Sequence, residues 1–135
     1  MTLNPRAFPK KGWANEHDAM PGCADKEGLK WMKAAMGGTK PSLTRDTFIW
    51  MLHGDVGEDN TKMGVLDEKD STPGQWIESG AHLMLMPKDP KTLEGFHADF
   101  SKGEPYVMMP GSIYAHLMIP LVGYYQYQLE SQPNN

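Results

Sequence analysis

The chain has 135 residues, of which 39% are hydrophobic, with 14 glycines and 11 prolines. This is enough for one domain with its own core, and too many turn-forming residues for a helical bundle. The formal net charge is −4 and no basic run with interleaved aromatics occurs, so a nucleic-acid-binding surface is not expected.

Charge is distributed unevenly along the chain. Residues 1–45 contain eight Lys or Arg against four Asp or Glu, whereas residues 46–135 contain five against thirteen. The acidic second part suits a basic partner or a cation. The longest apolar runs are only a handful of residues, so no membrane-spanning helix is predicted.

The N-terminal third predicts an extended arm followed by one helix. Residues 1–24 hold three prolines and two glycines, which favours irregular structure. Asp25 is a suitable N-cap, and Leu29, Met32 and Met36 share one helical face, which predicts a helix over 26–36. The glycines at 37 and 38 are expected to end it.

Four strands are predicted, at 47–53, 81–86, 105–109 and 114–121. The first is apolar throughout and is expected to be buried on both faces. The short connection 110–113 favours an antiparallel hairpin, and Pro90 predicts a short helical turn after Asp89. The acidic segment 54–74 lacks the residue order of an EF-hand and is expected to be a solvated loop, with a loose calcium site as the alternative.

These elements predict an α+β fold, with a small antiparallel sheet, an N-terminal helix and long loops. We expect residues 1–24 to form an extended N-terminal arm, 25–128 a single α+β domain and 129–135 a flexible tail. Tyr124, Tyr125 and Tyr127 are expected to dock on the domain before that tail begins.

The candidate site rests on histidine–methionine pairs two residues apart: Met51 and His53, His82 and Met84, and His116 and Met118. In a strand, residues i and i+2 project from the same face. If the strands 81–86 and 114–121 are neighbours, His82 and His116 can meet, with His53 as a third nitrogen and Met84 or Met118 as a weak thioether ligand. Such ligands favour copper.

Other interpretations of the same residues stay open. The histidines can satisfy backbone carbonyls in the core, and the methionines can fill space. A metal-free hydrolase-like enzyme using His116, with Ser112 and Tyr114 just before it and Asp55 after His53, is another class, although no Gly-x-Ser-x-Gly elbow supports it.

A third class is a small-molecule-binding or assembly module, which leaves open a homo-oligomer. Its ligand-contacting residues are predicted to be Trp50, Trp76 and Tyr114, with Met108, Met109 and the tyrosine-rich segment along a groove or subunit interface. Cys23 is the only cysteine, which excludes an internal disulfide, and it is expected to be a structural, partly buried thiol. His17 and His97 fall in predicted loops and are expected to face solvent.

Several motifs together resemble an uncharacterised family of small bacterial exported proteins. They are Trp76-Ile-Glu-Ser-Gly-Ala-His82-Leu-Met, Gly103-Glu-Pro-Tyr-Val-Met-Met and Tyr114-Ala-His116-Leu-Met-Ile-Pro120, preceded by Trp13, Cys23-Ala-Asp25 and Trp31-Met32. The resemblance covers roughly residues 12–121. It implies a compact domain that is periplasmic or secreted, and it assigns no chemistry.

Two departures from that family limit what the resemblance implies. Asn15 stands where the family has a cysteine, so the disulfide that this cysteine would make with Cys23 cannot form. A short proline-containing arm replaces the family's usual sequence before Trp13, and it lacks the apolar stretch of a signal peptide.

Overall fold

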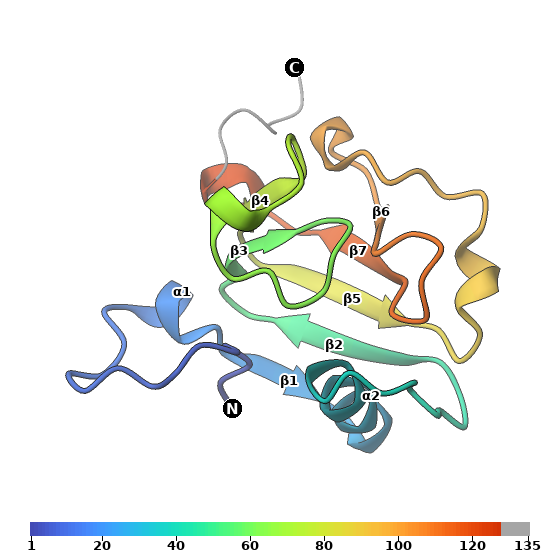
Figure 1. Ribbon diagram of the computed structural model, residues 1–135, viewed down its shortest axis with the longest axis horizontal. Coiled ribbons are helices and arrows are strands. Elements are labelled where there is room, and N and C mark those ends of the chain that lie inside the picture. Colours follow the sequence, from blue (N-terminus) through green and yellow to red (C-terminus); the bar gives the residue numbers. More distant parts are fainter. Residues whose placement is uncertain (128–135) are drawn as a thin grey trace.

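A computed structural model describes residues 1–127 and has an α+β fold, as predicted (Figure 1). Its main sheet is antiparallel and contains β1 (Gly22–Ala24), β2 (Thr47–Met51), β5 (His82–Met86), β7 (His116–Pro120) and β6 (Tyr106–Met108), in that spatial order. A two-stranded ribbon of β3 (Asp55–Asp59) and β4 (Trp76–Ser79) lies beside it. The predicted tail 129–135 falls outside the described residues.

Two α-helices and several short 3₁₀ turns complete the fold. The helices are α1 (Glu16–Ala19) and α2 (Lys26–Met36), and the 3₁₀ turns are η1 (Glu68–Asp70), η2 (Pro90–Leu93), η3 (Phe100–Lys102) and η4 (Tyr124–Tyr127). The arm expected at 1–24 therefore contains a helical turn and a strand. No helix among residues 1–127 is long and apolar enough to cross a membrane.

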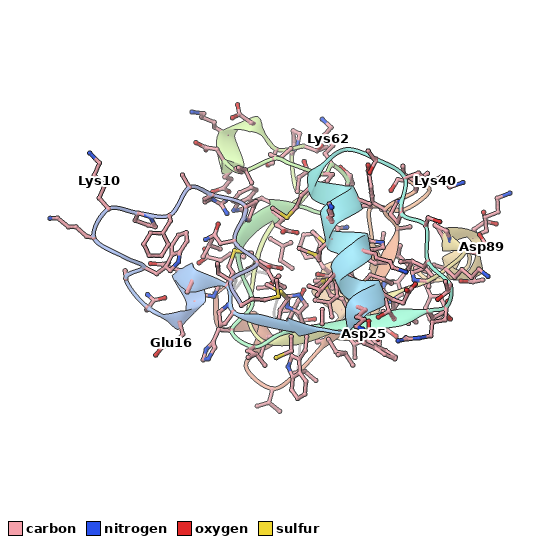
Figure 2. All side chains as sticks on the ribbon, turned by 90° about the horizontal axis from the view of Figure 1, so that it is seen from below. Lys10, Glu16, Asp25, Lys40, Lys62 and Asp89 are labelled. Atoms are coloured by element: carbon pink, nitrogen blue, oxygen red, sulfur yellow. The ribbon has the colours of Figure 1, made fainter. Side chains whose placement is uncertain are left out.

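Helix α2 begins and ends where the sequence predicts. The Asp25 carboxylate accepts a hydrogen bond of 2.8 Å from the Gly28 N–H, which satisfies one of the free donors of the first turn. Gly37 is the C-cap. In Figure 2 the helix runs from Asp25, beside the sheet, to the level of Lys62.

The buried face of α2 differs from the predicted one. Leu29 and Met36 are 39% and 64% exposed, whereas Gly28, Trp31 and Ala35 are buried. A Cβ on Gly28 would lie only 3.1 Å from the Ile49 side chain. The close approach of α2 to β2 at this glycine, rather than the line of large apolar residues, sets which face is covered.

Strand β2 is buried on one face only, which corrects the prediction for 47–53. Thr47, Ile49 and Met51 are buried, whereas Phe48 and Trp50 are 52% and 48% exposed. The second predicted strand, the hairpin of β6 and β7, and the helical turn at Pro90 are confirmed. Cys23, opposite Trp50, is exposed rather than partly buried.

The acidic segment is not simply a solvated loop. It opens with β3, in which Asp55 and Asp59 are 5% and 0% exposed. The Asp59 carboxylate accepts N–H hydrogen bonds from Thr61 at 2.7 Å and Thr72 at 2.5 Å. Burial opposes its ionisation, but these bonds lower its pKa to about 2. The bonds fix the segment after β3, which forms one wall of the site described below.

Tyr124 docks as predicted. It is 1% exposed, its hydroxyl hydrogen-bonds that of Tyr106, and its carbonyl accepts from the Gly80 N–H at 2.6 Å. These contacts close the chain over the junction between β4 and β5. The side chain of Tyr127 lies outside the described side chains.

Candidate functional site

A cavity of about 250 Å³ lies between α2, the covered face of the main sheet, the N-terminal arm and β3. We call it the methionine cavity, because seven of the eleven methionines line it: Met20, Met32, Met36, Met51, Met63, Met84 and Met109. Trp31 and Leu3 add apolar surface. The polar groups at its wall include Asp55, Glu58, Lys62 and His116.

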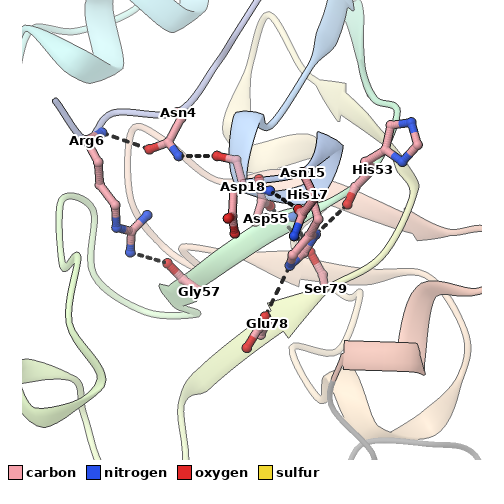
Figure 3. A network of polar contacts seen from close by, with 10 residues as sticks. All are labelled: Asn4, Arg6, Asn15, His17, Asp18, His53, Asp55, Gly57, Glu78 and Ser79. Atoms are coloured by element: carbon pink, nitrogen blue, oxygen red, sulfur yellow. Dashed lines mark hydrogen bonds and ion pairs between the residues drawn. The ribbon is translucent and has the colours of Figure 1, made fainter. Parts of the chain in front are cut away.

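The mouth of the cavity lies between the arm and the segment 62–66. Met36, Met63 and Leu66 line it and are all more than a third exposed. Arg6 ties the two sides together, because its guanidinium donates to the carbonyls of Gly57 at 3.3 Å and Leu66 at 2.7 Å. Figure 3 shows Arg6 reaching from the arm, where Asn4 holds its backbone, to β3.

A β-bulge brings two carboxyl groups to the same side of β3. Asp55 pairs with Ser79 and Glu58 with Ile77, so three steps along β3 match two along β4. In a regular strand, residues three apart point to opposite faces, and the extra residue restores the same side. Gly57 occupies the bulge with φ +121°, and a Cβ there would lie 2.1 Å from the Trp76 ring.

Neither carboxyl group forms an ion pair with a Lys or Arg of residues 1–127. The Ser79 hydroxyl donates to Asp55 Oδ2 at 3.4 Å, and no hydrogen bond from the described residues reaches the Glu58 carboxyl. Burial raises the pKa of Asp55. Burial, and then the negative charge of Asp55, raise the pKa of Glu58 well above its usual range, with the charge of Arg6 opposing. Both carboxyl groups therefore hold their protons more tightly than free carboxyl groups do, and a cation bound beside them would favour their ionised forms.

His82 lies behind this pair and is fully buried. Its Nδ1–H donates to the Gly80 carbonyl at 2.8 Å, and its Nε2 lies 3.5 Å from Asp55 Oδ2 without a hydrogen-bond partner among residues 1–127. Because Nδ1 donates to a carbonyl, Nε2 is the ring nitrogen that faces the Asp55 carboxyl. His82 does not line the cavity.

His116, in contrast, lines the cavity and is 3% exposed. Its Nδ1–H donates to the Tyr114 carbonyl at 2.8 Å, and its ring meets Trp31 edge-on, with centroids 5.1 Å apart. Burial lowers the pKa of His116 to about 4. The imidazole is therefore neutral at pH 7, with the Nε2 lone pair free to accept.

The structure does not bring the three predicted imidazoles together. β5 and β7 are neighbours, as the interpretation required, but His82 pairs with Pro120, four residues from His116. That stagger corresponds to about 13 Å along the strands. Among residues 1–127, no three His, Cys, Asp or Glu side chains are grouped so that they could hold a metal ion.

The other histidines are also placed differently from expectation. His53 lies beyond the end of β2 and is exposed, and Figure 3 shows its ring directed away from His17. His17, expected to face solvent, is buried, with Nδ1 2.6 Å from the His53 carbonyl and Nε2 3.1 Å from Glu78. It fastens α1 to β4. His97 is partly buried, 3.6 Å from Glu104.

The predicted methionine ligands fall on the covered face of the sheet. Met84 and Met118 pair with each other across β5 and β7 and are 7% and 1% exposed. Met84 lines the cavity and Met118 does not.

The residues predicted to contact a small molecule do not gather. Trp50 is on the opposite face of the sheet from the cavity, Trp76 packs over Gly57, and the Tyr114 hydroxyl donates to the Thr39 carbonyl at 3.0 Å. Met108 and Met109, expected along a groove or interface, are 1% and 3% exposed. The apolar lining comes instead mostly from methionines, which include Met84, predicted as a metal ligand, and Met109, predicted along a groove or interface.

The hydrolase interpretation finds no assembled nucleophile. The Ser112 hydroxyl donates to the Met109 carbonyl at 2.7 Å, and His116 is oriented by a backbone carbonyl rather than by a carboxylate. Activation of a serine needs a base within hydrogen-bond reach and a group that orients the base. Such an arrangement is not present among the described residues.

Comparison with protein-family models, with curated proteins and with solved structures gives no match to this chain. Sequence reasoning missed Glu58 as a site residue and named Asp55 only in the hydrolase interpretation. The glycine between them is the one signal that pointed to a bulge, because an isolated glycine inside a strand is typical of one.

Proposed function

We propose that the protein is a small binding protein whose methionine cavity holds a small cation or a cationic organic molecule. The observation that supports this most directly is the pair of carboxyl groups, Asp55 and Glu58, on the same side of β3 in a cavity lined mostly by apolar side chains. A buried carboxylate without a partner is costly, and a bound cation removes that cost.

The cavity is large enough for an organic ligand. An engineered apolar cavity of about 150 Å³ binds benzene, so about 250 Å³ accommodates an aromatic amine of similar size. Trp31 provides an aromatic surface for its positive charge. Export to the periplasm or beyond is part of the proposal, and it rests on the family resemblance alone.

Benzylamine and benzyl alcohol test the charge requirement, because they have the same shape and differ in charge. We expect benzylamine to raise the melting temperature at pH 8 and benzyl alcohol to do so much less. The effect should weaken as the pH is lowered, because protonation of Glu58, whose pKa is raised by burial, removes its charge. Equal stabilisation by both compounds, or none by any cation, would overturn the proposal.

The variant Glu58→Gln tests whether the Glu58 carboxyl group binds the cation. It keeps the shape of the side chain and removes the charge, so benzylamine should bind at least about tenfold more weakly. Glu94→Gln, which changes an exposed carboxyl far from the cavity, is the matched control and should bind like the wild type.

A further inference from the structure

We propose that the cation held by the methionine cavity is Cu(I), bound by Nε2 of His116 together with methionine thioethers. The inference rests on the proposed cation-binding function and names the ion. It differs from the site expected from the sequence, because it uses one imidazole of the cavity and leaves His82 and His53 out.

His116 has the arrangement of a metal-ligating histidine. Its Nδ1–H donates to the Tyr114 carbonyl at 2.8 Å, and ligating histidines almost always donate their second ring N–H in this way. The bond fixes the ring and leaves the Nε2 lone pair at the cavity wall.

Methionine thioethers near His116 supply the soft ligands. Met84 pairs with Met118 across β5 and β7 and is therefore the diagonal neighbour of His116 on the same face. Diagonal neighbours lie about 7–8 Å apart, within reach of long side chains. Met109 follows Met108, which pairs with His116 from the other side. Both Met84 and Met109 line the cavity and are buried.

This ligand set selects Cu(I) over harder ions. Thioethers are soft ligands that favour Cu(I), whereas Zn²⁺, Mg²⁺ and Ca²⁺ require several nitrogen, thiolate or oxygen ligands. No such group exists among the described residues. The Trp31 ring centroid lies 5.1 Å from that of His116 and adds an aromatic ring to this part of the cavity wall, and a cation bound there would favour the ionised forms of Asp55 and Glu58.

Anaerobic titration with Cu(I) against a coloured Cu(I) chelator tests the site. We expect one equivalent to bind, with X-ray absorption showing one nitrogen and two or more sulfur ligands. Coordination by oxygen and nitrogen alone would overturn the assignment. The X-ray absorption measurement uses the wild type, so it tests the ligand assignment even if a variant fails to fold.

Matched variants locate the ligands. His116→Ala should weaken Cu(I) binding at least about 100-fold, whereas His53→Ala, which changes an exposed histidine, should not. Met84→Leu should weaken binding, and Met86→Leu, on the same face of the same strand but away from the cavity, should not. Loss of binding in a folded His82→Gln variant equal to that in His116→Ala would contradict the proposal.

The result also separates this inference from the proposed function. If benzylamine binds through Glu58 but Cu(I) does not bind, the copper assignment is wrong and the cation-binding function stands. If neither binds, both are wrong.

Discussion

The two faces of the main sheet are both rich in apolar residues, but only one of them is covered. Under α2 and the β3–β4 ribbon, alternate residues of β2 and β5 are at most 7% exposed: Ile49, Met51, His82, Met84 and Met86. On the other face, Phe48 and Trp50 are about half exposed. Among the described residues, the cover of that face lies near β7, where Leu93 of η2 packs on Val107 and Leu117.

Hydrophobicity alone therefore does not decide which face of the sheet becomes the core. The covered face carries the polar groups His82 and His116, and it is covered because Gly28 lets α2 approach and the bulge at Gly57 lets β3 turn its carboxyl groups inward. The polar residues are placed by backbone features of the covering elements.

Breaking the bulge should have the largest effect on this arrangement. Gly57→Ala adds a Cβ at 2.1 Å from the Trp76 ring, at a φ of +121° that alanine rarely adopts. We expect a loss of about 4 kcal/mol or more in the free energy of unfolding, measured by urea denaturation. Gly64→Ala, with φ +80° but nothing within 4 Å of the added Cβ, is the control and should lose less. Equal losses would mean that backbone strain, not the bulge packing, dominates.

Neighbouring residues of β2 test the difference between the faces directly. Ile49→Ala removes a side chain that is 0% exposed and should cost about 3 kcal/mol. Phe48→Ala removes a larger side chain that is 52% exposed and should cost less than about 1 kcal/mol. A large loss in Phe48→Ala would show that a partner, for example a second copy of the chain, covers the open face in solution.

Much of the fold was predictable from the sequence because its signals are local. The cap at Asp25, the glycine at 37 and the short connection between β6 and β7 each specify structure within a few residues. The strand pair β3–β4 was not predictable, because Asp55, Glu58 and Asp59 have a composition typical of exposed loops. Their burial depends on bonds from distant residues, such as those from Thr72 to Asp59 and from Ser79 to Asp55.

The site was predictable only in part. Alternation correctly predicted that His82 and Met84 share a face, as do His116 and Met118. It could not give the register between β5 and β7, which separates His82 from His116. Register depends on the whole hydrogen-bonded ladder and its connecting turns, and neither is visible in a single strand.

Lowering the pH should destabilise the protein through His116, which lies on the covered face. Its pKa is lowered from 6.5 to about 4, so the unfolded chain takes up a proton first as the pH falls. Stability is therefore complete above pH 6.5 and is lost as the pH approaches 4, by up to about 3 kcal/mol at 1.4 kcal/mol per unit. His116→Gln should lack this part of the pH dependence when urea unfolding is compared at pH 7, 5.5 and 4. If the free energies of unfolding of the two proteins change with pH in parallel, His116 does not cause this loss.

Glu58 should act in the opposite direction. Because its folded-state pKa is raised, the unfolded chain releases its proton first as the pH rises above 4.5, and stability is lost as the pH rises through the folded-state value. Glu58→Gln removes this loss. The variant should melt a few degrees higher than the wild type at pH 8 and at nearly the same temperature at pH 4. A ligand that pairs with the carboxylate should abolish this difference in melting temperature. It stabilises the wild type at pH 8 by compensating the charge that the variant lacks. An advantage of the variant that persists at saturating benzylamine or Cu(I) would mean that the cation and Glu58 do not meet.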